Sequence, residues 1–280
     1  MSPSFSYQRH TPGRVPFEDA FSWHGPICPQ GIGALSELCA VHDGHRNLDD
    51  GLLQEVLAGS AQAWLESEGR AYVQRGATQL ELLVHPQWRG QGWGSWLLAK
   101  ALETRSEVTT WAYGDRESTV QWLERKHFTS HRLLHKMVYQ QTPPAPPDWP
   151  APCRLEIFRA ADAEDWHRLH VGLQKDPRRA WSLDRLHRQL KQPETPISRF
   201  WLLWEGRQMR GYVWLKHDEI FLLALDPAAR GRGIGRRLLQ WAMSQAKQAW
   251  GFCDQSETLA LYRKLGFCEV ERDRCLRHCK

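Results

Sequence analysis

Apolar and polar positions along this chain follow one order twice. In the first half, short apolar runs separated by turns predict strands, and the last run, LLV at 82–84, stops at His85-Pro86. A glycine-rich stretch follows, and beyond it apolar residues recur at helical spacing over 96–102. The pattern therefore predicts strands that lead through a loop into a helix.

The second half repeats this order almost position by position. Three segments recur at matching spacing, and their pairs are WLESEGR and WLLWEGR (64–70 and 201–207), LLVHPQWRGQGWGSWLL and LALDPAARGRGIGRRLL (82–98 and 223–239), and WAYGDRESTVQWLERKHF and WGFCDQSETLALYRKLGF (111–128 and 250–267). Internal repetition of this kind indicates two copies of one structural unit. We therefore predict two α/β units with the same architecture.

Further helices are expected in each copy. Residues 1–30 give no readable pattern, and Ser182 is the expected N-cap of one helix. The helices are predicted near 49–59, 116–126, 182–191 and 255–265.

A proline-rich segment separates the two copies. QTPPAPPDWPAP, at 141–152, holds six prolines, which remove backbone donors and keep the chain extended. We predict an N-terminal domain over 1–140, a linker over 141–152 and a C-terminal domain over 153–280.

Each copy contains a glycine-rich loop between its last apolar run and the helix that follows. RGQGWG at 89–94 and RGRGIG at 230–235 lie where free N–H groups and the helix dipole favour an anion. Neither loop has the Gly-Lys-Ser/Thr of a Walker A motif, nor the spacing and acid of a dinucleotide-binding fingerprint. The loops predict a phosphate-containing ligand of another class.

Both loops resemble the Arg/Gln-x-x-Gly-x-Gly/Ala loop of the GNAT superfamily of N-acetyltransferases, which cradles the pyrophosphate of acetyl-CoA. LYRKLGF at 261–267, about thirty residues on, strengthens the resemblance. The resemblance implies an α/β fold of the α+β type, with two tandem GNAT-like domains, each a mixed, mostly antiparallel sheet flanked by helices. It also implies acetyl-CoA as the acetyl donor and allows a second molecule in the N-terminal domain.

The resemblance implies which residues contact acetyl-CoA. In that family the strand before the loop bulges, and its free backbone groups pair with the pantetheine arm. In the second copy the residues so implied are Leu223, Ala224, Leu225, Arg230, Gly231, Arg232, Gly233, Ile234, Gly235, Arg236 and Gln255. In the first copy they are Leu82, Leu83, Val84, Arg89, Gly90, Gln91, Gly92, Trp93, Gly94 and Ser95. The three arginines of the second loop favour phosphate more strongly, although a solvated basic helix start is the alternative.

Catalysis is expected in the second copy. Aminolysis of a thioester needs a base for the amine proton and often an acid for the departing thiolate. Glu219 opens the strand that reaches the cofactor, and Tyr262 falls where the family places a Tyr near the coenzyme sulfur. Thr78 and Leu123 stand opposite them in the first copy, and neither does acid or base work. We therefore predict that the first copy is non-catalytic. The alternative interpretations in the second copy are that Glu219 is only an exposed acid at the end of a strand and that Tyr262 only packs inward from its helix.

Two segments, LELLVHPQWRGQGWG at 80–94 and VWLKHDEIFLLALDPAARGRGIG at 213–235, further resemble the mycothiol synthase family of tandem GNAT enzymes. Enzymes of that family acetylate the cysteinyl amine of cysteinyl-glucosaminyl-inositol. The resemblance implies Lys216, Glu219 and Asp50 as substrate contacts, although a surface Lys and a helix N-terminal acid are the plainer interpretations. Two departures lie on the substrate side. Asp176, in KDPRRAW, is the one acid in a loop where the family has His-Pro-Glu-Gln-Gly-Gly-Trp, and Trp250 replaces a family Tyr.

Composition excludes several classes of protein. Net charge is +5 without a long Lys/Arg block, which argues against nucleic acid, and no apolar run reaches membrane-spanning length. Seven cysteines fit reduced thiols. No metal is predicted, because the spacing of the cysteines and the histidine near the end of the chain matches no usual zinc pattern. We expect a cytoplasmic monomer that acts on a small-molecule amine.

Two alternatives remain at this point. One is a tandem acetyltransferase with another acceptor, such as an aminoglycoside, a polyamine or a protein N-terminus. The polyamine is disfavoured because Lys175, Arg178 and Arg179 crowd the candidate loop. The other is a non-catalytic acyl-CoA sensor, against which the retention of Glu219 and Tyr262 argues.

Overall fold

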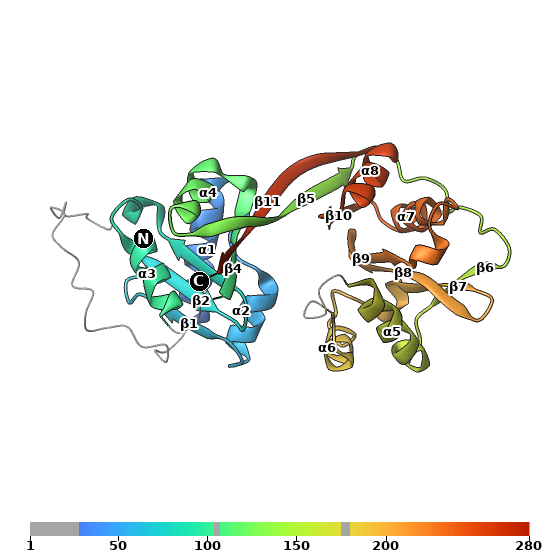
Figure 1. Ribbon diagram of the computed structural model, residues 1–280, viewed down its shortest axis with the longest axis horizontal. Helices are drawn as coiled ribbons and strands as arrows, with labels where there is room; N and C mark the ends of the chain where they lie inside the picture. Colours follow the sequence, from blue (N-terminus) through green and yellow to red (C-terminus); the bar gives the residue numbers. More distant parts are fainter. Residues whose placement is uncertain (1–27, 104–106, 175–179, 280) are drawn as a thin grey trace, which may run out of the picture. The chain divides into compact units, whose positions relative to one another are not determined.

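A computed structural model describes residues 28–103, 107–174 and 180–279 of the 280. The chain divides into two compact units, drawn in Figure 1. The first unit holds the described residues up to Leu133 together with those from Asp273 on, and the second holds 134–272.

In the first unit, helices cover both faces of the strands. β1 (Gln62–Leu65), β2 (Ala71–Arg75) and β3 (Leu80–Val84) form an antiparallel sheet in that order. β4 (Glu107–Ala112) pairs with the end of β11 (Phe267–Cys279) and touches the start of β3 through one parallel bridge, between Gln79 and Thr109. Apolar residues of α1 (Pro29–Asp43) and α2 (Asp50–Leu57) pack on one face, and those of α3 (Trp93–Leu102) and α4 (Glu117–Glu124) on the other.

The second unit repeats this arrangement. β6 (Cys153–Ile157), β7 (Phe200–Glu205), β8 (Gln208–Lys216) and β9 (Glu219–Leu225) are antiparallel neighbours in order. β10 (Trp250–Cys253) lies parallel to β9 and antiparallel to β5 (Phe128–Tyr139). One core joins α5 (Ala163–Leu173) and α6 (Leu183–Gln189) to the sheet, and another joins α7 (Ile234–Ser244) and α8 (Ser256–Lys264) to its other face. The mixed, mostly antiparallel sheets between helices are the fold class that the sequence predicts.

The compact units divide the chain inside β5 and inside β11, whereas the predicted domain bounds lie at the proline-rich segment 141–152. The reason is strand pairing. His135 to Val138 of β5 pair with β10 in the second unit, and Arg274 to Cys279 of β11 pair with β4 in the first. The predicted domain boundaries at 140 and 153 therefore differ from the boundaries of the compact units, which lie within β5 and β11.

The predicted helices near 49–59, 116–126, 182–191 and 255–265 are confirmed as α2, α4, α6 and α8. The Ser182 hydroxyl caps α6 by accepting from the Arg185 N–H at 3.2 Å. α1 and α5 were not predicted. For α5 a signal exists, because Ala163, Trp166 and His170 are buried at helical spacing. Within the described residues, no helix is both long enough and apolar enough to cross a membrane.

Candidate active site

The glycine-rich loop of the second unit leads into the N-terminus of α7. The Asp226 carboxylate accepts from the Ala228 N–H at 3.0 Å and starts a short 3-10 turn, Pro227–Ala229. Gly231 and Gly233 then adopt φ of 74° and 73°, values that L side chains rarely adopt. α7 has Gly233 as its N-cap and no side-chain cap. Its first N–H groups are therefore available to an anion.

The arginines of this loop differ in their partners. Arg232 donates to Glu205 at 2.6 Å, and this bond is the main reason that the pKa of Glu205 is lowered. Arg230 and Arg236 form no ion pair with any described residue. Two of the three predicted arginines can therefore meet a phosphate without breaking a bond to the protein.

The strand before the loop carries a bulge. β9 pairs with β8 in regular register on either side of Phe221, which is the extra residue between Leu222, opposite Trp214, and Ile220, opposite Leu215. Bulges bend a strand and free its backbone groups locally. The register between β9 and β10 gives only one pair, Glu219 with Trp250. Leu223 to Leu225 therefore lie where the two strands have separated, as a pantetheine-binding edge requires.

Three of the predicted residues share one face of the sheet. Lys216 pairs with Glu219 across β8 and β9, and Glu219 pairs with Trp250 across β9 and β10. Directly paired side chains point to the same side. Because Tyr212 and Trp214 of β8 pack toward α5 and α6 on that side, Lys216, Glu219 and Trp250 lie on the α5 and α6 face.

Tyr262 of α8 lies on the opposite face. It packs in the core with Leu215 and Ile220, and 2% of it is exposed. Burial, with smaller contributions from Cys253 and Glu219, raises the pKa of its phenol above the ordinary value. Among the described residues its hydroxyl has no hydrogen-bond partner. The phenol is therefore protonated at neutral pH and free to donate.

The remaining predicted contacts have simpler surroundings. The ammonium group of Lys136 lies 5.4 Å from the centre of the Trp250 ring. Gln255 is the N-cap residue of α8 and makes no side-chain cap bond. Asp50 is the first residue of α2, but its side chain, like all of Asp176, lies outside the described residues.

The comparison of the two copies needs one correction. Counting along the sequence places Thr78 opposite Glu219. In the structure Arg75 of β2, which matches Leu215 of β8, pairs with Leu80, whereas Leu215 pairs with Ile220, so Leu80 matches Ile220. Gln79 therefore stands at the position of Glu219, because β3 pairs with β2 without a bulge and is one residue shorter. Gln79 has no acid or base chemistry either.

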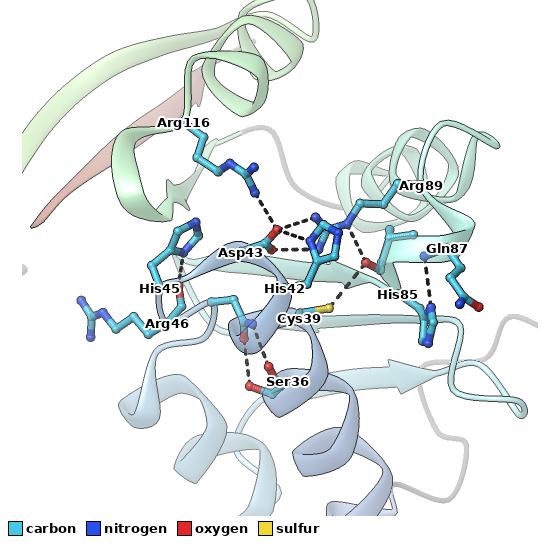
Figure 2. A network of polar contacts seen from close by, with 12 residues as sticks. Ser36, Cys39, His42, Asp43, His45, Arg46, His85, Gln87, Arg89 and Arg116 are labelled. Carbon is cyan, nitrogen blue, oxygen red and sulfur yellow. Dashed lines mark hydrogen bonds and ion pairs between the residues drawn. The ribbon is translucent and has the colours of Figure 1, made fainter.

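The loop of the first unit has its arginine engaged (Figure 2). Arg89 donates to both carboxylate oxygens of Asp43, at 2.7 and 2.8 Å, and through Nε to the Val84 carbonyl at 3.0 Å. Arg116 and His42 also contact Asp43, at 2.6 and 3.1 Å. Burial alone raises the pKa of this carboxyl, but the bonds from Arg89 and His42 outweigh it and hold the pKa well below its usual range. The Asp43 carboxylate thus pairs with the arginine that would otherwise contact the phosphate of a ligand.

A cavity of about 730 Å³ lies beside this network. All of the predicted first-copy cofactor residues except Gln91 line it. The positions in this unit that match Glu219 and Tyr262 are Gln79 and Leu123, which have no acid or base chemistry. Volume alone does not identify the reacting site, and the residue chemistry points to the second unit.

The sequence analysis missed one acidic residue in this cavity. Glu81 of β3 is 2% exposed and accepts from the Asp49 N–H, Gln74, Gln79 and the Tyr113 hydroxyl at 2.9, 2.6, 3.1 and 2.5 Å. Burial raises the pKa of Glu81 to about 7. The sequence did contain a signal for Glu81, which is an acidic residue within an otherwise apolar strand segment. Four donors around one carboxyl indicate a structural role.

The described residues contain no group of three or more His, Cys, Asp or Glu side chains arranged to hold a metal ion. Cys268, one of the cysteines near the end of the chain, is an exposed free thiol.

Comparisons with known proteins agree with this geometry. Residues 196–269 match the family model of the acetyltransferase (GNAT) domain. A relative called mycothiol acetyltransferase, from Thermobispora bispora, is 30% identical over 270 residues, with 85% of this chain and 92% of the relative covered.

Two solved structures share the fold. A GCN5-related N-acetyltransferase from Sphaerobacter thermophilus matches with a TM-score of 0.67 and 22% identity, over 88% of this chain and 91% of that one. A tandem GNAT protein from the clavulanic acid biosynthesis pathway matches with a TM-score of 0.63 and 15% identity, over 92% of this chain and 96% of that one.

Proposed function

Because this chain belongs to the GNAT family of acetyltransferases, we propose that its second unit transfers acetyl from acetyl-CoA to a primary amine, namely the cysteinyl amine of cysteinyl-glucosaminyl-inositol. The observation that carries the proposal is the pair Glu219 and Tyr262. They approach the point where β9 and β10 separate from opposite faces of the sheet, with a carboxylate on one side and a protonated phenol on the other.

The donor is proposed to lie along the separated edge of β9. The backbone of Leu223 to Leu225 would pair with the pantetheine arm as an added strand does. The pyrophosphate would meet the first N–H groups of α7, with Arg230 and Arg236 as its counter-charges. This placement puts the thioester beside the contact between Glu219 and Trp250.

The two side chains then divide the proton transfers. Glu219 accepts the proton of the ammonium group, directly or through a water, so that the neutral amine attacks the thioester carbonyl carbon. The C–S bond breaks as the amide forms, and Tyr262 donates its proton to the departing thiolate. The proton that the nitrogen loses as it becomes an amide passes to solvent, from which Tyr262 is protonated again. The raised pKa of Tyr262 keeps that proton in place until the thiolate appears.

The first unit is proposed to bind acyl-CoA weakly or to serve a structural role. Its loop arginine is held by Asp43, and the Val84 carbonyl, which would pair with pantetheine, already accepts from Arg89. A pyrophosphate would have to displace a carboxylate from a bidentate ion pair whose carboxylate is 9% exposed.

The choice of acceptor rests on the similarity to mycothiol acetyltransferases and on the sheet face that Glu219 shares with Lys216. The mycothiol acetyltransferase of Thermobispora bispora spans most of this chain. Lys216 and Glu219 offer charged hydrogen-bond partners to the hydroxyls and the amine of a cysteinyl pseudodisaccharide. Trp250, where a smaller phenol is found in that family, is the observation that favours a different amine as the second candidate.

A thiol-release assay tests both candidates. Purified chain is mixed with acetyl-CoA and, separately, with cysteinyl-glucosaminyl-inositol, glucosaminyl-inositol, an aminoglycoside and a peptide with a free N-terminus. We expect release of coenzyme A with the first amine and little with glucosaminyl-inositol, which lacks the cysteinyl amine. Turnover of another amine alone would replace the acceptor and keep the acetyltransferase. Binding of acetyl-CoA without turnover of any amine would indicate a sensor.

A further inference from the structure

Gly251 of β10 lies close to the candidate acid, with little room for a side chain. A Cβ atom built on Gly251 would stand 3.1 Å from the Tyr262 hydroxyl oxygen. It would also stand 3.2 Å from both the Cβ and the carbonyl oxygen of Ile220 on β9. Contacts of this length are tighter than ordinary van der Waals contact, so an alanine would force a neighbour to move.

Backbone conformation does not explain the glycine. Gly251 is absent from the glycines of positive φ, all of which lie in turns, loops and caps. It sits inside a strand and pairs with Met137 of β5. Glycine weakens a strand, and within one it often marks a close approach of another group. Here the approaching groups are the Tyr262 hydroxyl and Ile220 of β9.

The first unit shows the same position without the phenol. Counted from the shared helix, Ala112 corresponds to Gly251 and Leu123 to Tyr262. Ala112 is buried in the core that also contains Leu123. In this unit β4 touches β3 at Thr109, three residues earlier, so that the strands have already separated at Ala112. The first unit, which has no phenol hydroxyl and no closely approaching strand at this position, therefore has an alanine there instead of a glycine.

We propose that Gly251 is a positioning residue for acetyl transfer: the missing side chain lets the Tyr262 hydroxyl reach the edge of β10 where the strands part and the coenzyme thiolate leaves. The proposal rests on the proposed function. A Cβ at this position pushes the hydroxyl a few tenths of an ångström from the sulfur while leaving the pyrophosphate site untouched.

The expected effect is on turnover rather than on binding. Misplacement by 1 Å costs roughly 10²-fold in rate, so Gly251→Ala should lower kcat about 5- to 20-fold. KM for acetyl-CoA and its affinity by calorimetry should change less than about twofold, because the loop and α7 keep their geometry. Ala112→Gly is the matched control in the first unit and should leave both quantities unchanged.

A double-mutant cycle separates positioning from structural damage. Once the hydroxyl is removed there is nothing left to misplace, so Gly251→Ala combined with Tyr262→Phe should be no slower than Tyr262→Phe alone. If the two losses multiply instead, Gly251 acts through the fold and the proposal is overturned. A wild-type kcat for Gly251→Ala overturns it as well. If Tyr262→Phe alone keeps the full rate, the acid role itself fails, and the single variant reveals this independently.

A second pair of variants keeps the proposal testable if Gly251→Ala folds poorly. Gly251→Ala with Tyr262→Leu copies the Ala112 and Leu123 pair of the first unit and should recover the thermal stability that Gly251→Ala loses. Recovery supports the contact between Gly251 and the hydroxyl. Equal instability of both variants would assign the clash to Ile220 and overturn the role of Tyr262.

Discussion

Asp43 closes the glycine loop of the first unit by accepting two hydrogen bonds from Arg89, at 2.7 and 2.8 Å, although 46 positions separate the two residues. The carboxylate is held by Arg116 and His42 as well, so the cations that would meet a pyrophosphate already have a negative partner. The cavity at this loop has room for a ligand, and the two arginines among the described residues that line it are both paired with Asp43.

Asp43→Asn should therefore convert the first unit into a second acyl-CoA site. The neutral amide leaves Arg89 and Arg116 without a counter-ion, which a pyrophosphate then supplies. Calorimetry with acetyl-CoA should give one site per wild-type chain and two per variant chain. Asp43→Glu, which keeps the charge, should stay at one. Two sites in the wild type would show that the ion pair does not block the loop.

Gly233→Val should lower acetyl-transfer turnover by about 10²-fold or more, because a side chain stands where the pyrophosphate approaches the backbone and α7 begins. Gly92→Val is the matched control. Gly92 has φ of 94° and Gly233 has φ of 73°, so both variants suffer backbone strain of the same kind. Steady-state rates that fall equally in both would contradict the assignment of catalysis to the second unit.

Glu219→Gln should reduce kcat by about 10²- to 10⁴-fold, the range for a lost general base, with acetyl-CoA affinity nearly intact. The acid limb of the pH-rate profile should vanish with the carboxylate. Gln79→Ala, at the matching position of the first unit, should leave the profile as it is. A full rate with an unchanged acid limb would assign the amine proton to water or to another carboxylate.

Glu81 should make the first unit less stable as the pH rises. Its folded pKa of about 7 lies above the ordinary value, so the folded state binds the proton more tightly than the unfolded state. The contribution is complete below the unfolded pKa of about 4.5 and is lost as the pH rises through 7, a total of about 3 kcal/mol. Urea unfolding followed by tryptophan fluorescence should show this fall between pH 5 and 8. Glu81→Gln should flatten it, whereas stability that rises over this window would exclude a protonated Glu81.

Local patterns in the sequence determined much of this protein. The repeat predicted two units, the turn and strand spacing predicted β2, β3, β8 and β9, and the glycine loops predicted where α3 and α7 begin. Glu219 and Tyr262 were singled out by the family resemblance and by the lack of acid and base chemistry opposite them in the first copy, and their roles stay predictions. Neighbours along the chain decide the repeat, the strands and the starts of the helices, so the sequence is enough to predict these features.

Contacts between distant residues were decided only in the tertiary structure. The bulge at Phe221 shifts the register by one residue and puts Gln79, not Thr78, at the place of Glu219. The boundaries of the two units lie within β5 and β11 and not at the proline-rich segment, because strand pairing depends on which strand edges meet. Asp43 reaches Arg89, and Gly251 reaches the Tyr262 hydroxyl, through packing that no local period records. Hydrophobic patterning selects elements and faces, whereas ångström-scale fit between side chains arises only when those elements pack.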